Sequence, residues 1–152
     1  LLVLLARTTV NLRKTAITIV SLVALASVMN YAGMIVVIAS ALATVTGQLY
    51  PVFAPLIGAV GTFVTGSDTS SNILFAKLQA NVAHQLNYSN SNWLVAANTT
   101  GATGGKIISP QSIAIATAAC DMQGRDGEIL KAAIPYAILY IAVGGLMVLL
   151  AV

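Results

Sequence analysis

Four long apolar tracts, separated by short polar loops, dominate the chain. Only 7% of its residues are charged, whereas 58% are hydrophobic. A soluble domain carries about 25% charged residues because its surface must face water. A chain with so few charges cannot cover a water-facing surface, so its outside must face hydrocarbon. The tracts therefore predict an all-α membrane protein with several transmembrane spans.

The few charged and thiol groups narrow the possible functions. The net charge is +3, and the basic residues flank apolar tracts, which is a topology signal rather than a nucleic-acid-binding surface. The single Cys120 excludes an intrachain disulfide and a cysteine metal cluster, and one histidine cannot provide metal-ligand spacing. The sequence therefore predicts no nucleic-acid partner, no metal and no cofactor.

The first part of the chain resembles the middle of a longer protein. Leu1 is not an initiator methionine, and residues 1–6 read as the tail of an earlier span. We therefore expect residues 1–152 to form one transmembrane domain, the C-terminal part of a longer protein. Residues 7–15 form a basic polar loop, and the apolar tract 16–45 is too long for one straight crossing of about 30 Å. The polar residues 30–33 near its centre predict a tilted or locally broken span.

Residues 51–86 predict a re-entrant helical hairpin. Two apolar arms, residues 52–64 and 73–86, flank a polar tip at residues 65–72. Each arm is roughly 20 Å long as a helix, about two-thirds of a bilayer core. A polar tip at that depth must line a cavity or be buried in protein. If the hairpin enters and leaves on one side, the basic loops before and after it share that side, as the positive-inside rule favours.

A discontinuous transmembrane helix follows. Residues 93–97 are apolar, residues 98–109 are polar and glycine-rich, and residues 110–119 are again apolar. A mixed-charge loop at 121–131 and a plain final span at 132–152 complete the chain. Polar interruptions of this kind are the best sequence indication of a transport site.

Each interruption exposes backbone N–H groups at the start of the next helix, where the helix dipole favours an anion. At the hairpin, Thr69, Ser70 or Ser71 is expected to cap an arm that starts near Asn72. At the second break, Ser109 stands at an N-cap position, and a proline follows at the first helical position. We expect the two helix N-termini to converge on one small carboxylate.

The side chains at the two breaks suit a hydroxy acid, because they offer both donors and acceptors of hydrogen bonds. Lys106 adds a positive charge for the carboxylate, although its alternative roles are snorkelling to the interface or pairing with Asp68. The predicted substrate-binding residues are Ser70, Ser71, Asn72, Asn98, Thr99, Thr100, Lys106 and Ser109.

Asp68 is the only carboxylate in the part expected to lie within the membrane, and we assign it to proton coupling. Its alternative role is that of a turn or cap residue. A polar stripe at Lys77, Asn81, His84 and Tyr88 lies on one helix face, which water or protein contacts explain without a function. His84 as a proton relay is the alternative to that explanation.

Four segments resemble those of a known family: residues 29–34 (MNYAGM), 66–72 (GSDTSSN), 96–101 (AANTTG) and 105–114 (GKIISPQSIA). On these strings the chain resembles the L-lactate permease family. The resemblance implies a multi-pass symporter of the bacterial plasma membrane that carries L-lactate, and often D-lactate and glycolate, with protons. It also implies a longer parent permease, of which this chain lacks the N-terminal part.

Two alternatives stay open. The Ser-Ser-Asn tip also resembles, more distantly, the Ser-Asn-Thr tips of dicarboxylate carriers, which often use sodium, so a sodium-coupled or glycolate-preferring carrier is the first alternative. The second is an intramembrane enzyme with Ser67, Ser70 or Ser71 as nucleophile. That enzyme needs a base, and the one available histidine, His84, lies three or more helical turns from the tip.

Overall fold

The computed structural model describes residues 17, 20–21, 23–122 and 124–152, and this part of the chain is helical without strands. The prediction of an all-α fold is confirmed. The predicted polar loop at residues 7–15 and the tail of an earlier span at residues 1–6 lie outside the described residues. The elements are α2 (Met34–Thr46), η1 (Gly47–Leu49), α3 (Tyr50–Thr65), α4 (Asp68–Gln85), α5 (Asn92–Ile107), α6 (Pro110–Ala119) and α7 (Asp126–Ala151).

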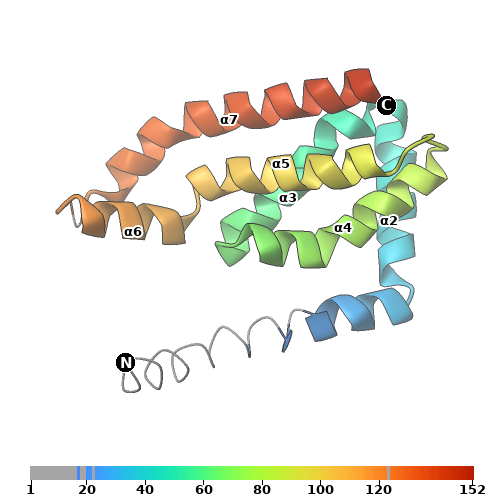
Figure 1. Ribbon diagram of the computed structural model, residues 1–152, viewed down its shortest axis with the longest axis horizontal. Coiled ribbons are helices and arrows are strands. Elements are labelled where there is room, and N and C mark those ends of the chain that lie inside the picture. The colour runs from blue at the N-terminus through green and yellow to red at the C-terminus, as the bar shows by residue number, and fades with distance from the viewer. Residues whose placement is uncertain (1–16, 18–19, 22, 123) are drawn as a thin grey trace, which may run out of the picture.

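The first long apolar tract is a broken span rather than a tilted one. Residues 23–31 are helical, residues 32–33 form a turn, and α2 begins at Met34 in a different direction (Figure 1). Gly33 makes the turn possible with a φ of 72°, a left-handed conformation that glycine adopts without a Cβ penalty. Gly47, with a φ of 53°, marks a second change of direction, into α3.

Helices α3 and α4 form an antiparallel hairpin whose tip is much shorter than predicted. Only Gly66 and Ser67 are non-helical, because Gly66 ends α3 with a φ of 69° and Ser67 caps α4 by accepting from the Ser70 N–H at 3.3 Å. The predicted capping by Thr69, Ser70 or Ser71 was therefore wrong, and the arm starts four residues before Asn72. The re-entrant position of this hairpin in the bilayer stays a prediction.

The discontinuous helix is confirmed, but its break is only two residues long. Helix α5 continues through the polar, glycine-rich segment that the sequence predicts as irregular, and only Ile108 and Ser109 separate it from α6. Threonine hydroxyls in α5 donate to carbonyls four residues earlier, which satisfies them without disturbing the helix. The predicted Ser109 cap is confirmed, since its Oγ accepts from the Ser112 N–H at 3.3 Å.

The last helix begins earlier than predicted, at Asp126 instead of residue 132. Its first turn is stabilised by an ion pair between Arg125 and Glu128 and by the Thr117 hydroxyl, which donates to Asp126 Oδ1 at 2.8 Å. At 26 residues α7 is about 39 Å long, enough to cross a bilayer. Together with the stretch Met34–Thr65, it is long and apolar enough to span.

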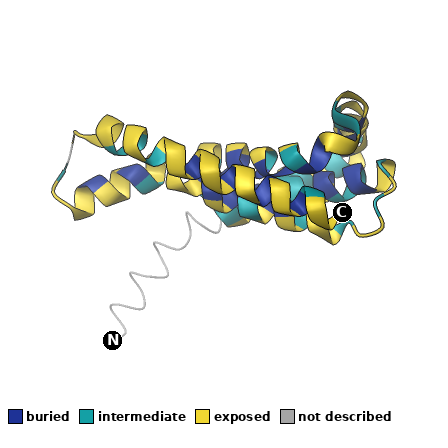
Figure 2. Ribbon diagram, turned by 90° about the horizontal axis from the view of Figure 1, so that it is seen from above, coloured by how far each residue is buried: buried dark blue, intermediate teal, exposed yellow. Residues whose placement is uncertain are grey.

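The outer faces of the bundle are exposed (Figure 2), and many of their side chains are apolar, as those of a surface in hydrocarbon must be. On α7 the exposed side chains include Leu139, Leu146 and Leu150, which are 62%, 55% and 80% exposed. On α3 they include Val60 and Val64. Such a large exposed apolar surface would cause aggregation in water, so the structure agrees with the membrane class indicated by composition.

Helices α3 and α5 run parallel with their backbones in direct contact. A Cβ atom added to Gly101 would overlap the carbonyl of Pro55, and one added to Gly105 would overlap the carbonyl of Ala59. Small residues allow this approach, which gives dispersion contacts where lipid supplies no hydrophobic drive. The antiparallel α7 packs over both helices, with Gly144 against Thr100.

Replacing Gly101 with alanine is expected to destabilise the protein by about 1–3 kcal/mol, because the new methyl group must push α3 away from α5. Thermal unfolding of the purified protein in detergent measures the loss. Gly127→Ala is the matched control, since a Cβ there meets nothing within 4 Å. Equal melting temperatures of the two variants would contradict the backbone contact.

Candidate functional site

A chain of buried polar side chains links α3, α4 and α5. The Tyr50 hydroxyl donates to Gln79 Oε1 at 2.7 Å, and Gln79 Nε2 donates to the Ala54 carbonyl at 3.1 Å and to Asn98 Oδ1 at 3.3 Å. Tyr50, Gln79 and Asn98 are fully buried. Since an unpaired polar group inside a membrane protein is costly, these mutual hydrogen bonds determine how the three helices can pack.

The chain of hydrogen bonds reaches the protein surface at Asn72 and Thr99, two of the predicted binding residues. Asn98 Nδ2 donates to Asn72 Oδ1 at 2.9 Å, and the Thr99 hydroxyl donates to the same oxygen at 3.1 Å. Asn72 Nδ2 makes no hydrogen bond within the described part of the chain, so it can donate to a ligand. We call Asn72, Asn98 and Thr99 the asparagine cluster. It joins the start of α4 to the middle of α5.

The N-termini of α4 and α6 lie next to each other, beside the hairpin tip (Figure 1). Gln111, in the first turn of α6, rests directly against Gly66, because a Cβ at that glycine would overlap its Oε1 atom. Two groups of backbone N–H donors therefore come close together, each with the positive end of a helix dipole. An anion between them as a common ligand stays a prediction.

Asp68 is the first residue of α4 and is half-buried at the hairpin tip. Its Oδ1 atom is buried without a hydrogen-bond partner among the described residues. The alternative pairing with Lys106 is not formed, since the ion pair found in the described ranges joins Arg125 and Glu128. An unpaired, desolvated carboxylate oxygen is an acceptor that a proton or a cation can satisfy.

Lys106 is exposed and lies apart from the asparagine cluster. It shares a face of α5 with Thr99 and Thr103, and seven residues from Thr99 correspond to about 10 Å along the helix. Lys106 lines a cavity of about 400 Å³ between α5, α6 and the start of α7, beside Thr103 and Ser112. The predicted residues are thus distributed along a path rather than gathered at one point.

The other predicted residues take part in local structure. The fully buried Ser71 donates to the Gly58 carbonyl at 2.8 Å, and Thr100 donates to the Ala96 carbonyl at 3.1 Å. Ser70 supplies the backbone N–H that Ser67 caps, and Ser109 caps α6. These contacts hold the hairpin and the break in shape, and a direct role in binding stays a prediction for all four.

Three residues of the site were not predicted from the sequence. Gln79 lies two helical turns after Asn72 on α4, so a search for polar residues seven apart finds it. Gln111 belongs to the motif after Pro110 and was overlooked as a first-turn residue. Tyr50 has no local signal, because its partner Gln79 is 29 positions away.

The geometry does not favour the serine enzyme considered above. His84 is exposed near the C-terminal end of α4, whereas Ser67, Ser70 and Ser71 lie at its N-terminal end. The 13 residues between Ser71 and His84 correspond to about 20 Å of helix. A histidine base must lie within hydrogen-bond reach of its nucleophile, so His84 does not serve these serines.

Interrupted helices, with polar side chains inside an apolar bundle, are typical of polytopic membrane proteins. The family model for L-lactate permease matches residues 1–152, so the chain belongs to the L-lactate permease family.

Individual relatives agree with the family assignment. A glycolate permease of Escherichia coli (strain K12) is 45% identical over 95% of this chain and 26% of its own length. An L-lactate permease of the same strain is 45% identical over 82% of the chain and 22% of its own length, and one of Bacillus subtilis (strain 168) is 39% identical over 84% and 22%. The chain thus spans about a quarter of these relatives' length. No solved structure matches it.

Substituting Asn98 with alanine is expected to destabilise the protein by about 1–3 kcal/mol, because Gln79 loses a buried acceptor and Asn72 a donor. The melting temperature in detergent measures the effect. In the control Thr103→Ala, an exposed hydroxyl that donates only to its own helix is removed, and little change is expected. If Asn98→Ala has the same melting temperature as the control Thr103→Ala, the buried chain of hydrogen bonds does not hold the helices together.

Proposed function

We propose that this chain is part of a secondary carrier that moves L-lactate and related 2-hydroxymonocarboxylates, such as D-lactate and glycolate, across the bacterial plasma membrane with protons. The names of its relatives, L-lactate permease and glycolate permease, support the substrate class. The observation that carries the proposal is the asparagine cluster, which joins the hairpin to the discontinuous helix near the start of α4.

Each part of a 2-hydroxy acid has a matching group in this arrangement. The carboxylate accepts from backbone N–H groups at the start of α4, about one helical turn from Asn72, where the helix dipole stabilises negative charge. The 2-hydroxyl group both donates and accepts, and it meets the Asn72 amide and the Thr99 hydroxyl. Rigid-body movement of one part of the carrier against the rest then exposes the site to each side in turn.

Asp68 is the proposed proton carrier, since its unpaired oxygen lies at the same hairpin tip. Protonation removes the negative charge that would otherwise repel the substrate, so proton and anion bind together. Sodium coupling is the alternative, with the oxygens of the tip as cation ligands. The longer permease that contains this chain and the lipid bilayer are the partners that complete the carrier.

Uptake of radiolabelled L-lactate into vesicles that contain the full-length carrier tests the function. Accumulation that follows a proton gradient and collapses with an uncoupler is the expected result. Accumulation that follows a sodium gradient alone would overturn proton coupling and keep the carrier. Absence of uptake under either gradient, for both lactate and glycolate, would overturn the proposed function.

Asp68→Asn is expected to abolish proton-driven accumulation of L-lactate, because an amide cannot release a proton at neutral pH. Exchange of internal for external lactate without a gradient should continue, since the site is still able to bind and move. Asp121→Asn in the loop after α6 is the control, and it should accumulate like the wild type. Equal accumulation by Asp68→Asn would exclude Asp68 as the proton carrier.

Thr99→Val keeps the shape of the side chain but removes the hydroxyl, so the KM for L-lactate is expected to rise about fivefold, as the loss of a hydrogen bond of roughly 1 kcal/mol predicts. Initial rates of uptake at increasing lactate concentration measure this change. Thr44→Val makes the same change on an exposed face of α2 and should leave the KM unaltered. An unaltered KM in both variants would remove Thr99 from the substrate site.

A further inference from the structure

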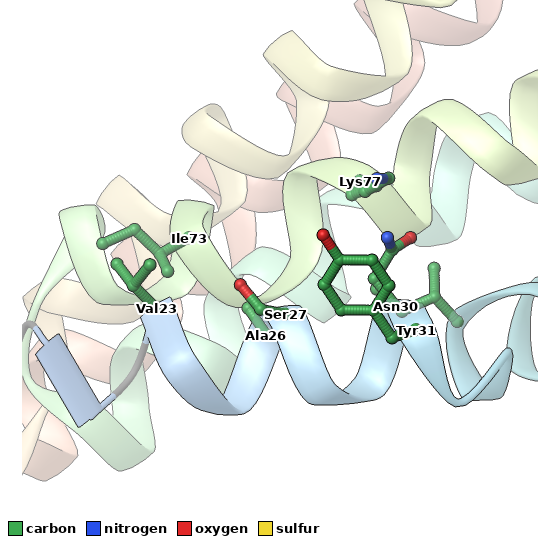
Figure 3. A pocket seen from close by; sticks show the side chains of 8 residues that line it. Val23, Ala26, Ser27, Asn30, Tyr31, Ile73 and Lys77 are labelled. Atoms are coloured by element: carbon green, nitrogen blue, oxygen red, sulfur yellow. The ribbon is translucent and has the colours of Figure 1, made fainter.

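A second polar cavity lies between residues 23–31 and α4, outside the site described so far (Figure 3). Its volume is about 440 Å³, within the roughly 300–1,000 Å³ typical of small-molecule sites. Lys77 lines it from α4, and Ser27, Asn30 and Tyr31 line it from the opposite helix. In Figure 3 the ends of Lys77 and Asn30 face each other across the gap between the two helices.

Lys77 brings a positive charge to this cavity, and no acidic side chain among the described residues lines it. Asp68, the described carboxylate on the same helix, is nine residues away, about 13 Å along the axis. The other described carboxylates, Asp121, Asp126 and Glu128, lie at the distant junction of α6 and α7. Lys77 is exposed and forms no ion pair within the described residues, so its positive charge favours an anionic ligand in the cavity.

The groups around Lys77 can bind a hydroxyl group and a methyl group as well as a carboxylate. The Ser27 hydroxyl, the Asn30 amide and the Tyr31 hydroxyl donate to a carboxylate, and the carbonyl oxygen of Asn30 accepts from an adjacent hydroxyl group. Val23 and Ile73 supply an apolar wall for a methyl group. By contrast, the cavity at Lys106 adds only Thr103 and Ser112 as polar side chains.

We infer that the cavity between residues 23–31 and α4 binds a small 2-hydroxymonocarboxylate, with Lys77 as the positive charge opposite its carboxylate. This inference rests on the proposed function and adds a second anion site on another face of α4. Ile73, which lines the cavity, directly follows Asn72 of the asparagine cluster. Lys77 is five residues from Asn72, about 7.5 Å along α4 and about 140° around it, so the two sites lie on different faces of one helix.

Protection of a cysteine in the cavity tests binding separately from transport. In the full-length carrier with its native cysteines replaced, Ala26→Cys places a single thiol in the cavity wall. L-lactate at ten times the concentration that gives half-protection is expected to slow maleimide labelling about tenfold. The reason is that the free fraction of the cavity falls as 1/(1 + [L]/Kd). Sodium chloride at the same concentration should not slow the labelling of Ala26→Cys. Neither salt should slow the labelling of Ser89→Cys in the loop between α4 and α5.

Lys77→Gln in the Ala26→Cys background is expected to raise the lactate concentration for half-protection at least tenfold, and Lys77→Arg should recover part of the loss because it keeps the charge. Lys131→Gln on α7 is the matched charge-removing control, and it should not change protection. If Lys77→Gln fails to fold, the protection experiment with Lys77 intact still shows whether L-lactate binds in the cavity.

Normal lactate uptake without protection of Ala26→Cys would overturn the Lys77 site and leave the proposed function standing. That result also covers the case in which an acidic side chain elsewhere in the carrier neutralises Lys77. Absence of uptake by the unmodified carrier would overturn the proposed function itself, whatever the labelling shows. A larger effect of Lys106→Gln than of Lys77→Gln on half-protection would assign the counter-charge to Lys106 and overturn the inference.

Discussion

The close contact between the backbones of α3 and α5 is the constraint on which the rest of the structure depends. Gly58, Gly101 and Gly105 have no side chain at this contact, so a carbonyl of the facing helix lies directly against each of them. In a membrane, where neighbouring helices gain little from leaving lipid, such dispersion contact is a main source of association. The contact sets Asn98 against α3 and turns its side chain toward α4, where Gln79 and Asn72 meet it.

The polar interior and the polar path follow from this packing. Because α5 stays helical through its glycine-rich segment, its backbone needs no outside partners, and its side chains are left for α4. Buried amides then pair with one another, whereas groups at the edge, such as Asn72 and Thr99, keep capacity for a ligand. The hairpin tip, with the start of α6 beside it, adds backbone donors about one helical turn from Asn72. The result is a rigid scaffold with a polar surface along α4 and α5.

Helix boundaries predicted from adjacent residues were confirmed where only local hydrogen bonds decide them. They were wrong where contacts with other helices decide them. Ser109 followed by proline was predicted as a helix start and is one, because capping depends only on adjacent residues. Residues 98–109 were predicted as a break in the helix, but close packing against α3 and α7 keeps residues 98–107 in a continuous helix that glycine disfavours in isolation. Ser67 was overlooked as a cap because four other hydroxyl or carboxylate residues follow it directly.

The sequence by itself determined that this protein is surrounded by lipid, and it indicated the segments in which the helices are interrupted. A chain with 7% charged residues must face lipid, and glycine or serine at a helix end acts through its own backbone. Only the tertiary structure decided which polar side chains meet. The pairs Tyr50–Gln79 and Asn72–Asn98 join residues more than 25 positions apart, and the Lys77 cavity needs a helix some 50 positions upstream. Such contacts depend on the angle and register at which whole helices pack, and no local pattern specifies those.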